Sequence, residues 1–488
     1  MNSRPAPFAT AALLLLTLVA TQRASAQNTQ VKGGDTESGA RNAAAYVAKN
    51  VASAVFISGR DVEEVVRVDI GSPLPGLVKY EVDEDQKRVT VTSTPYGKAT
   101  ATAIFREGLG CTLVNGLTEE ELRAQPVPEL PGPPKGYDDA LWPAGKRVDL
   151  SDLPDEIDAE LLAEALDNAF AEPDPDRTTR RTRAVLVAYQ GQIVAERYAE
   201  GFHAQMPLLS HSMTKSMTNA LVGIRVGQGK LDIRQPLGLP EWSSADDPRR
   251  AITLDHLLRM SSGLEWDEVY LDLTSDVVQM LYGERDAAAF AFNRELEDPI
   301  DSRWYYSSGT TNIISHALRE TFDGDLAAYF AFPRQALLRR LGMYHSFIEP
   351  CPDGTFVGSS FSYCTPRDWA RLAMLYMNDG MWHGERILPE GWVAYSTTPT
   401  PGASRGRYGA QIWLNVGEPD EPTRREMPDV PTDAFSFNGF DGQFVVAVPS
   451  RELIVVRMGH TRNRGAFRIN DLVRDVLAAM EPVAVGAE

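Results

Sequence analysis

Two predicted strand pairs stand at opposite ends of a long, mainly helical stretch, and this arrangement constrains the fold more than any other feature. The first pair covers residues 184–188 and 193–195, and the second covers 444–448 and 453–456. Each pair consists of two apolar runs around a short turn, which is typical of a β-hairpin. We therefore predict an α+β fold, in which one antiparallel sheet is built from both ends of the domain. Helices flank this sheet, and a helical insertion separates its two halves.

The chain ahead of this sheet divides into three predicted regions. Residues 1–26 fit a secretory signal peptide, because Arg4 precedes an apolar run at 11–20 and the small residues 24–26 fit a cleavage site. An uncleaved membrane anchor is the alternative. Residues 27–125 form an accessory region, for which we predict one helix and three strands at 43–51, 78–82, 88–93 and 100–105. The proline-rich stretch 126–145 is a linker or a strap across the main domain, which covers 146–488.

Composition and charge exclude several functional classes. The formal net charge of −19 argues against nucleic acid and against an anionic membrane surface as partners. We expect a periplasmic or secreted protein that has no stable membrane span after signal cleavage. No His or Cys pair has the spacing of a zinc site, so we expect neither a metal nor a cofactor. Cys351 and Cys364 are close enough in sequence to pair, which would leave Cys111 odd, but the sequence leaves this open.

Lysine is rare in this chain, and one lysine stands in a catalytic pattern. Nine of the 48 basic residues are lysine, and after Arg147 only Lys215 and Lys230 remain. Arginine keeps its proton in proteins, whereas a buried lysine can lose it and act as a base. Lys215 follows Ser212 by three residues at the start of a predicted helix, so one turn brings an alcohol beside an amine. Burial should lower the pKa of Lys215. A capping serine followed by an exposed lysine is the alternative interpretation.

Two further segments carry candidate chemistry. Residues 304–309 (WYYSSG) contain Tyr306, whose hydroxyl can relay a proton beside an ammonium group. Residues 437–443 (FNGFDGQ) lead into the last hairpin, where glycine allows the backbone to approach a substrate closely. A backbone N–H there, opposite the one of Ser212, would complete an oxyanion hole. An ordinary loop anchor and a glycine bulge are the respective alternatives.

Together and in this order, these segments resemble the serine β-lactamase and penicillin-binding protein superfamily. The likeness is greater to its class C-type branch, which contains esterases, D-aminopeptidases and 6-aminohexanoate-dimer hydrolases. It extends over about residues 184–480 and leaves out 27–125, and it implies a β-lactamase/transpeptidase-like fold. By this resemblance Ser212 is the nucleophile of an acyl-enzyme mechanism, and Lys215 and Tyr306 transfer its proton. The resemblance also implies an oxyanion hole from the backbone N–H groups of Ser212 and Phe440, and substrate contacts at Tyr270, Ser308 and Gly439.

The chain departs from the family pattern at two positions. Ser308 stands where asparagine is usual, and Phe437 stands where penicillin-recognising relatives carry a cation that binds the substrate carboxylate. We therefore predict a secreted serine hydrolase for a small-molecule ester or small amide. A DD-peptidase or β-lactamase, or a non-catalytic binding protein on a hydrolase fold, are the alternatives. Residues 402–406 also fit the G-x-S-x-G elbow of α/β-hydrolases, but the required strand and helix are not predicted around them.

Overall fold

The computed structural model describes residues 36–71, 78–93, 99–129, 131–174, 178–418, 420–421 and 423–480. The predicted signal peptide and the first residues of the accessory region lie outside this range. All of these described residues belong to one compact unit. Within the described residues, no helix has both the length and the apolar character needed to cross a membrane.

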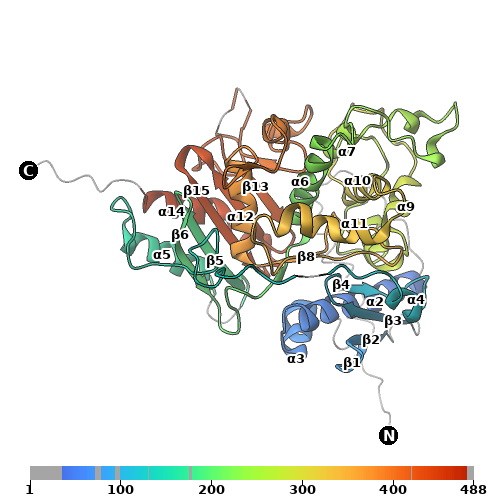
Figure 1. Ribbon diagram of the computed structural model, residues 1–488, viewed down its shortest axis with the longest axis horizontal. Helices are drawn as coiled ribbons and strands as arrows, with labels where there is room; N and C mark the ends of the chain where they lie inside the picture. Colours follow the sequence, from blue (N-terminus) through green and yellow to red (C-terminus); the bar gives the residue numbers. More distant parts are fainter. Residues whose placement is uncertain are drawn as a thin grey trace, which may run out of the picture. The chain divides into compact units, whose positions relative to one another are not determined.

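A six-stranded antiparallel sheet forms the centre of the main domain (Figure 1). Its strands, in spatial order, are β12 (Trp413–Leu414), β13 (Phe435–Gly439), β14 (Gln443–Val448), β15 (Leu453–Gly459), β5 (Thr182–Tyr189) and β6 (Gln192–Tyr198). Strand β15 pairs antiparallel with β5, which joins the two ends of the domain. The predicted α+β fold class is therefore confirmed.

Helices cover both faces of this sheet, because successive strand residues point to opposite sides. Val185 and Val187 of β5 pack in one apolar cluster with α5 (Ala159–Phe170) and α14 (Ile469–Ala478). Leu186 belongs to the opposite cluster, which includes α12 (Pro366–Met377). Nearly every side chain of β5 is therefore buried, which explains its almost continuous apolar sequence.

The insertion between the two halves of the sheet is mainly helical. Its helices are α6 (Thr214–Gly227), α7 (Leu254–Leu258), α8 (Asp276–Val278), α9 (Ala287–Phe292), α10 (Ser308–Glu320), α11 (Leu326–Pro333), α12 and α13 (Trp392–Ser396). Thr253 caps α7 through its side chain, as its sequence position indicates. A small sheet of β7 (Leu208–Leu209), β9 (Ser362–Cys364) and β8 (Phe347–Ile348) leads into α6. A short hairpin, β10 (Met381–Trp382) and β11 (Glu385–Arg386), follows α12.

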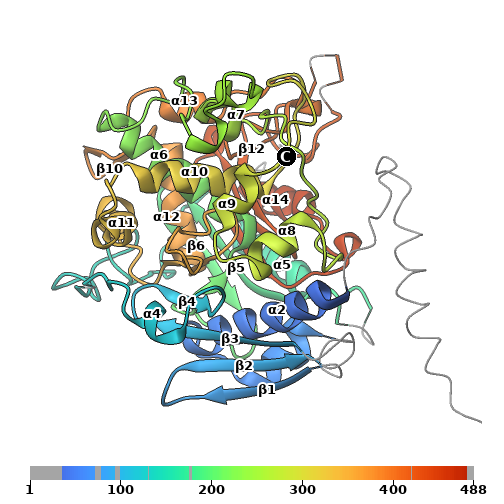
Figure 2. The same cartoon turned by 90° about the vertical axis from the view of Figure 1, so that its right-hand side faces the viewer.

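The accessory region contributes a helix and a second sheet, seen together in Figure 2. Helix α2 (Thr36–Phe56) packs on the antiparallel strands β1 (Val78–Asp83), β2 (Arg88–Ser93), β3 (Ala99–Arg106) and β4 (Gly110–Leu113). The helix extends beyond the predicted 43–51 at both ends, and β4 is an additional strand. Three short helices complete the region: α3 (Val62–Val65), the π-turn η2 (Val66–Ile70) and α4 (Glu119–Arg123). Val47 and Val51 of α2 share one apolar cluster with the helices of the insertion.

The proline-rich stretch lies against α12. The guanidinium group of Arg371 donates to the backbone oxygens of Pro143 (3.0 Å) and Gly145 (2.6 Å). The hydroxyl of Tyr137 donates to the oxygen of Gly342 at 3.1 Å. These contacts hold the stretch against the main domain.

Two open points of the sequence are resolved by the fold. Cys111, Cys351 and Cys364 are all buried free thiols, so the Cys351–Cys364 pair is not formed. Ser404 lies in a 3₁₀ turn, Ser404–Gly406, that neither follows a strand nor starts an α-helix. It therefore lacks the strand-turn-helix setting of a nucleophile elbow.

Candidate active site

The segment that carries Ser212 bends sharply between β7 and α6. His211 has a left-handed backbone (φ +50°), and the 3₁₀ turn His211–Met213 leads directly into α6. Ser212 therefore stands at the N-terminal end of a helix, where free backbone N–H groups and the helix dipole favour a negative charge. Ser210 is anchored below it, because Trp369 donates from Nε1 to the Ser210 hydroxyl at 2.9 Å.

Lys215 is buried one helical turn further on, with three polar partners. Its Nζ lies 3.2 Å from Ser212 Oγ, 3.0 Å from Ser308 Oγ and 3.0 Å from the backbone oxygen of Ser359. Only 1% of the residue is exposed. Burial lowers the pKa of Lys215 to about 8, although the nearby Glu268 charge acts in the opposite direction. About one tenth of the amine is therefore uncharged at pH 7, far more than for an exposed lysine.

Tyr306 completes the cluster from the loop before α10. Lys215 Nζ lies 4.9 Å from the centroid of the Tyr306 ring. Burial and then the Glu268 charge raise the pKa of the Tyr306 hydroxyl far above its usual value, while a hydrogen bond with Ser212 opposes this shift. The phenol is therefore protonated at rest, and of the two groups Lys215 is the one that can accept a proton.

The end of β13 comes very close to the segment that leads to Ser212. A Cβ atom at Gly439 would lie 2.3 Å from the backbone oxygen of Ser210, so only glycine fits there. The next residue, Phe440, has its ring stacked on Tyr270 (centroids 4.8 Å apart) and edge-on to His211 (5.7 Å). The structure thus brings Phe440 and Tyr270 together beside the turn that carries Ser212.

Glu268 joins these residues, and the sequence analysis missed it. Its carboxylate accepts hydrogen bonds from the Ser308 N–H (2.9 Å), the Ser308 hydroxyl (2.5 Å), the Tyr270 hydroxyl (3.1 Å) and Trp266 Nε1 (2.5 Å). Ser308 therefore links Lys215 to a carboxylate. The sequence signal is weak, because Glu268 is one of three acids within residues 265–268.

The position that holds a cation in penicillin-recognising relatives is part of the core here. Phe437 is fully buried, and its ring packs against Trp369 (6.0 Å) and Tyr376 (5.6 Å). His211 supplies no positive charge either, because burial lowers its pKa to about 4. These two residues therefore offer no positive charge to a substrate carboxylate.

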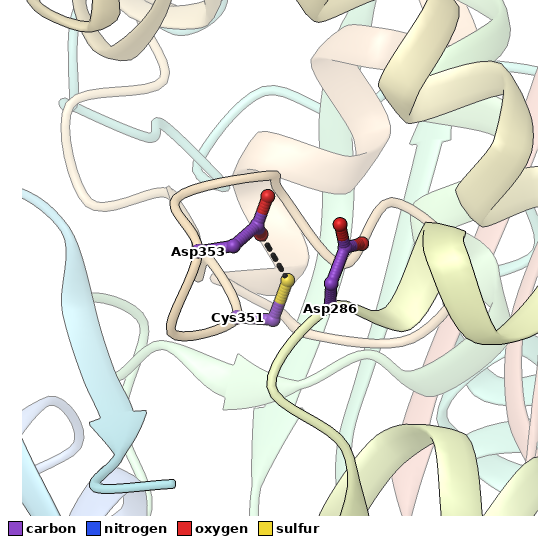
Figure 3. Close-up of side chains that lie close together, drawn as sticks. All are labelled: Asp286, Cys351 and Asp353. Atoms are coloured by element: carbon purple, nitrogen blue, oxygen red, sulfur yellow. Dashed lines mark hydrogen bonds between the residues drawn. The ribbon is translucent and has the colours of Figure 1, made fainter. Parts of the chain in front are cut away.

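A second cluster of polar groups, in Figure 3, lies outside this site. Asp286, Cys351 and Asp353 have ligand atoms within 4.8 Å of one another. The Cys351 thiol, however, donates to Asp353 at 3.0 Å, and Asp286 accepts from two backbone N–H groups as the N-cap of α9. Arg319 neutralises Asp353. Burial also raises the pKa of the Cys351 thiol well above its usual value, whereas metal binding requires the thiolate. Each of the three groups therefore has its own protein partner, and we assign them a structural role.

Comparison with known proteins identifies the family. The beta-lactamase family model matches residues 166–479, which is more than half of the chain. The chain belongs to the beta-lactamase family. It is 26% identical over 232 residues to the 6-aminohexanoate-dimer hydrolase of Paenarthrobacter ureafaciens. That match covers 43% of this chain and 56% of the relative, so the chain spans little more than half the length of this protein.

Solved structures show the same fold at low sequence identity. A penicillin-binding protein homologue from Caulobacter crescentus is 17% identical, with a TM-score of 0.51, and the match covers 68% of this chain and 100% of that one. A family VIII carboxylesterase is 16% identical, also with a TM-score of 0.51, and the match covers 67% and 98%. The expected membership of the β-lactamase and penicillin-binding superfamily is therefore confirmed, and the chain carries the fold of its serine hydrolases.

Proposed function

We propose that this protein is a serine hydrolase that cleaves an ester or a small amide through an acyl-enzyme on Ser212. The observation that carries this proposal is the buried Lys215 amine, 3.2 Å from the Ser212 hydroxyl, with a pKa lowered to about 8. A serine needs an adjacent base to become nucleophilic. A lysine with a pKa near the working pH is well suited to that task.

The partners of Lys215 direct its lone pair to Ser212. The backbone oxygen of Ser359 can only accept hydrogen bonds, and the Ser308 hydroxyl already donates its proton to Glu268. A neutral amine would therefore donate one N–H to each of these two groups. Of these three partners, only the Ser212 hydroxyl is then free to donate to the remaining lone pair.

The proposed reaction follows from this arrangement. Lys215 takes the proton of Ser212, and the serine oxygen attacks the substrate carbonyl carbon. The resulting oxyanion accepts from the backbone N–H groups of Ser212 and Phe440. The Lys215 ammonium then returns the proton through the Tyr306 hydroxyl to the leaving alcohol or amine, and the carbonyl bond to the leaving group breaks. Water releases the acyl group by the reverse path.

The surroundings of Ser212 favour esters and small amides over β-lactams. Phe437 replaces the cation that would bind the carboxylate of a penicillin, whereas Tyr270 and Phe440 offer an aromatic wall. The similar proteins include a hydrolase of the 6-aminohexanoate dimer and a carboxylesterase. A DD-peptidase or β-lactamase activity is the second candidate. A non-catalytic binding protein is disfavoured, because it needs no lysine of lowered pKa beside a serine.

A substrate screen tests the proposal. Wild type and Ser212→Ala would be assayed with p-nitrophenyl esters of short acids, linear amides, D-amino-acid peptides and nitrocefin. We expect turnover of esters or amides by wild type and none by Ser212→Ala with an unchanged fold. Turnover of nitrocefin alone would favour the second candidate. Full ester turnover by Ser212→Ala would refute the mechanism.

We propose in addition that the protein is exported to the periplasm or beyond. The support is the sequence of residues 1–26, with Arg4, an apolar run and small residues at 24–26. N-terminal sequencing of protein from periplasm and culture medium would find Gln27 as the first residue if the peptide is cleaved there. Recovery of the protein from the cytoplasm alone, with an intact Met1, would contradict the proposal.

A further inference from the structure

The N-terminal layer, residues 36–71 with strands β1–β4, makes polar contacts with several segments that carry the candidate active site. Ser58 donates to the backbone oxygen of Pro207, five residues before Ser212. Asn42 donates to the backbone oxygen of Leu273, three residues after Tyr270. This layer lies outside the region that matches the family model.

A buried ion pair joins the same layer to the loop beneath Lys215. Lys49 of α2 pairs with Glu349, which also accepts from the Ser53 hydroxyl (2.8 Å) and the Cys111 N–H (2.6 Å). The side chain of Glu349 is completely buried. Glu349 starts the loop that contains Ser359, whose backbone oxygen is a partner of Lys215.

A third connection reaches the turn between β13 and β14, which carries Phe440. The backbone oxygens of Asp69 and Ile70 in the N-terminal layer both accept from Nη2 of Arg462. The Arg462 charge also acts on the hydroxyl of Tyr46 in α2, where it opposes the rise in pKa that burial causes. Arg462 in turn donates from Nε to His460 Nε2 at 3.2 Å.

His460 links Arg462 to Asp441 in this turn. Burial lowers its pKa well below the usual value, so the ring is neutral. Because Nε2 accepts from Arg462, the ring proton sits on Nδ1, which faces the Asp441 carboxylate at 3.2 Å. Asp441 directly follows Phe440, has a left-handed backbone (φ +59°), and accepts from the Thr461 N–H through its own backbone oxygen at 2.8 Å.

We propose that the N-terminal layer is a working part of the active site, because the chain Arg462–His460–Asp441 holds the turn in which Phe440 presents its backbone N–H to the oxyanion. This inference rests on the proposed function, which uses that N–H. Arg462, His460 and Asp441 are positioning residues, since they act through the turn. A small displacement of a catalytic group is enough to matter, because a shift of about 1 Å can cost roughly 100-fold in rate.

Four variants test the proposal by steady-state kinetics with the ester that the screen identifies. His460→Leu removes the donor to Asp441, and we expect kcat to fall by roughly 10- to 100-fold while KM stays within about threefold. His460→Asn places an amide donor where Nδ1 was, and we expect it to recover much of this loss. Arg462→Met cuts the link to the N-terminal layer at an exposed residue, and we expect a loss of about three- to tenfold. Arg468 is an exposed arginine of the same segment, and Arg468→Met is the control, which should leave kcat unchanged.

Hydrogen–deuterium exchange of the same variants provides a readout that does not depend on turnover. We expect faster exchange in peptides that cover residues 437–443 for His460→Leu and Arg462→Met, with no change for Arg468→Met. Should His460→Leu fail to fold, Arg462→Met alone decides. Wild-type kcat and wild-type exchange in a folded Arg462→Met would overturn the proposal.

Ser212→Ala in the same assay separates this inference from the proposed function. If Ser212→Ala is inactive and both His460→Leu and Arg462→Met keep wild-type kcat, only the positioning role is refuted. If Ser212→Ala keeps full turnover, the proposed function is refuted. The role of the Phe440 N–H as an oxyanion donor is then refuted as well.

Discussion

Glu268→Gln should move the pH dependence of the enzyme to lower pH. One hydroxyl, that of Ser308, bridges Lys215 Nζ and the Glu268 carboxylate at 3.0 and 2.5 Å. Their charges therefore lie within roughly 5.5 Å of each other, which corresponds to about 3 kcal/mol at an effective dielectric constant of about 20. Glu268 is only partly buried, so solvent screening reduces this energy, and we use about half of it.

The direction of the expected shift in the pKa of Lys215 follows from the two charges. The Glu268 carboxylate stabilises the Lys215 ammonium and raises the pKa of Lys215. Glutamine keeps an acceptor at this position but removes the charge, so the pKa of Lys215 should fall from about 8 to about 7. His211, Tyr306 and Tyr270 are the other titratable groups around the cluster, and all three are neutral near pH 7 because burial lowers the pKa of the histidine and raises those of the tyrosines.

The assay is the pH profile of kcat/KM for ester hydrolysis between pH 5 and 9. We expect the acid limb of Glu268→Gln to lie about one pH unit below that of wild type, whatever happens to the maximum. Glu295→Gln, an exposed acid of the insertion, should leave the limb in place. An acid limb that stays fixed, or moves to higher pH, would refute the assignment of Lys215 as the base that Glu268 controls.

Three further outcomes are expected. Gly439→Ala should lower kcat by on the order of 100-fold, since its Cβ would lie 2.3 Å from the Ser210 oxygen and must push β13 away; wild-type kinetics would contradict this. Tyr306→Phe should lower kcat by at least about 100-fold, because proton relay to the leaving group is lost, and an unchanged rate would exclude that role. Lys49→Met should reduce the free energy of unfolding in urea by about 3–5 kcal/mol, because it leaves the buried Glu349 charge unpaired; a change below about 1 kcal/mol would show that the pair is not needed for stability.

Local sequence patterns predict four of the six strands of the central sheet, β5, β6, β14 and β15, but not β12 and β13. Each of the two predicted hairpins consists of two apolar runs on either side of a short turn. This pattern identifies the strands without tertiary information. Helix α2 is longer than its prediction because the added residues 36–42 and 52–56 are mostly polar or small and show little periodic contrast. The packing of the helix on β2, β3 and β4 is visible only in the folded chain.

The sequence predicts those residues of the candidate site that lie close together along the chain. It misses those that meet only when the chain folds. Ser212 and Lys215 are three residues apart, so helix geometry alone brings them together. Glu268 meets Ser308 across 40 residues of chain, and no local pattern marks that contact. The link from Asp69 to Arg462 spans 393 residues, which explains why the accessory region shows no catalytic pattern of its own.

The acyl-enzyme on Ser212 can be trapped by rapid acid quench during ester turnover and located by mass spectrometry of the digested protein. With p-nitrophenyl butyrate as substrate, we expect a butyryl group on the peptide that contains Ser212, and no such group in Ser212→Ala. An acyl group on another residue, or steady turnover by Ser212→Ala, would show that Ser212 is not the nucleophile.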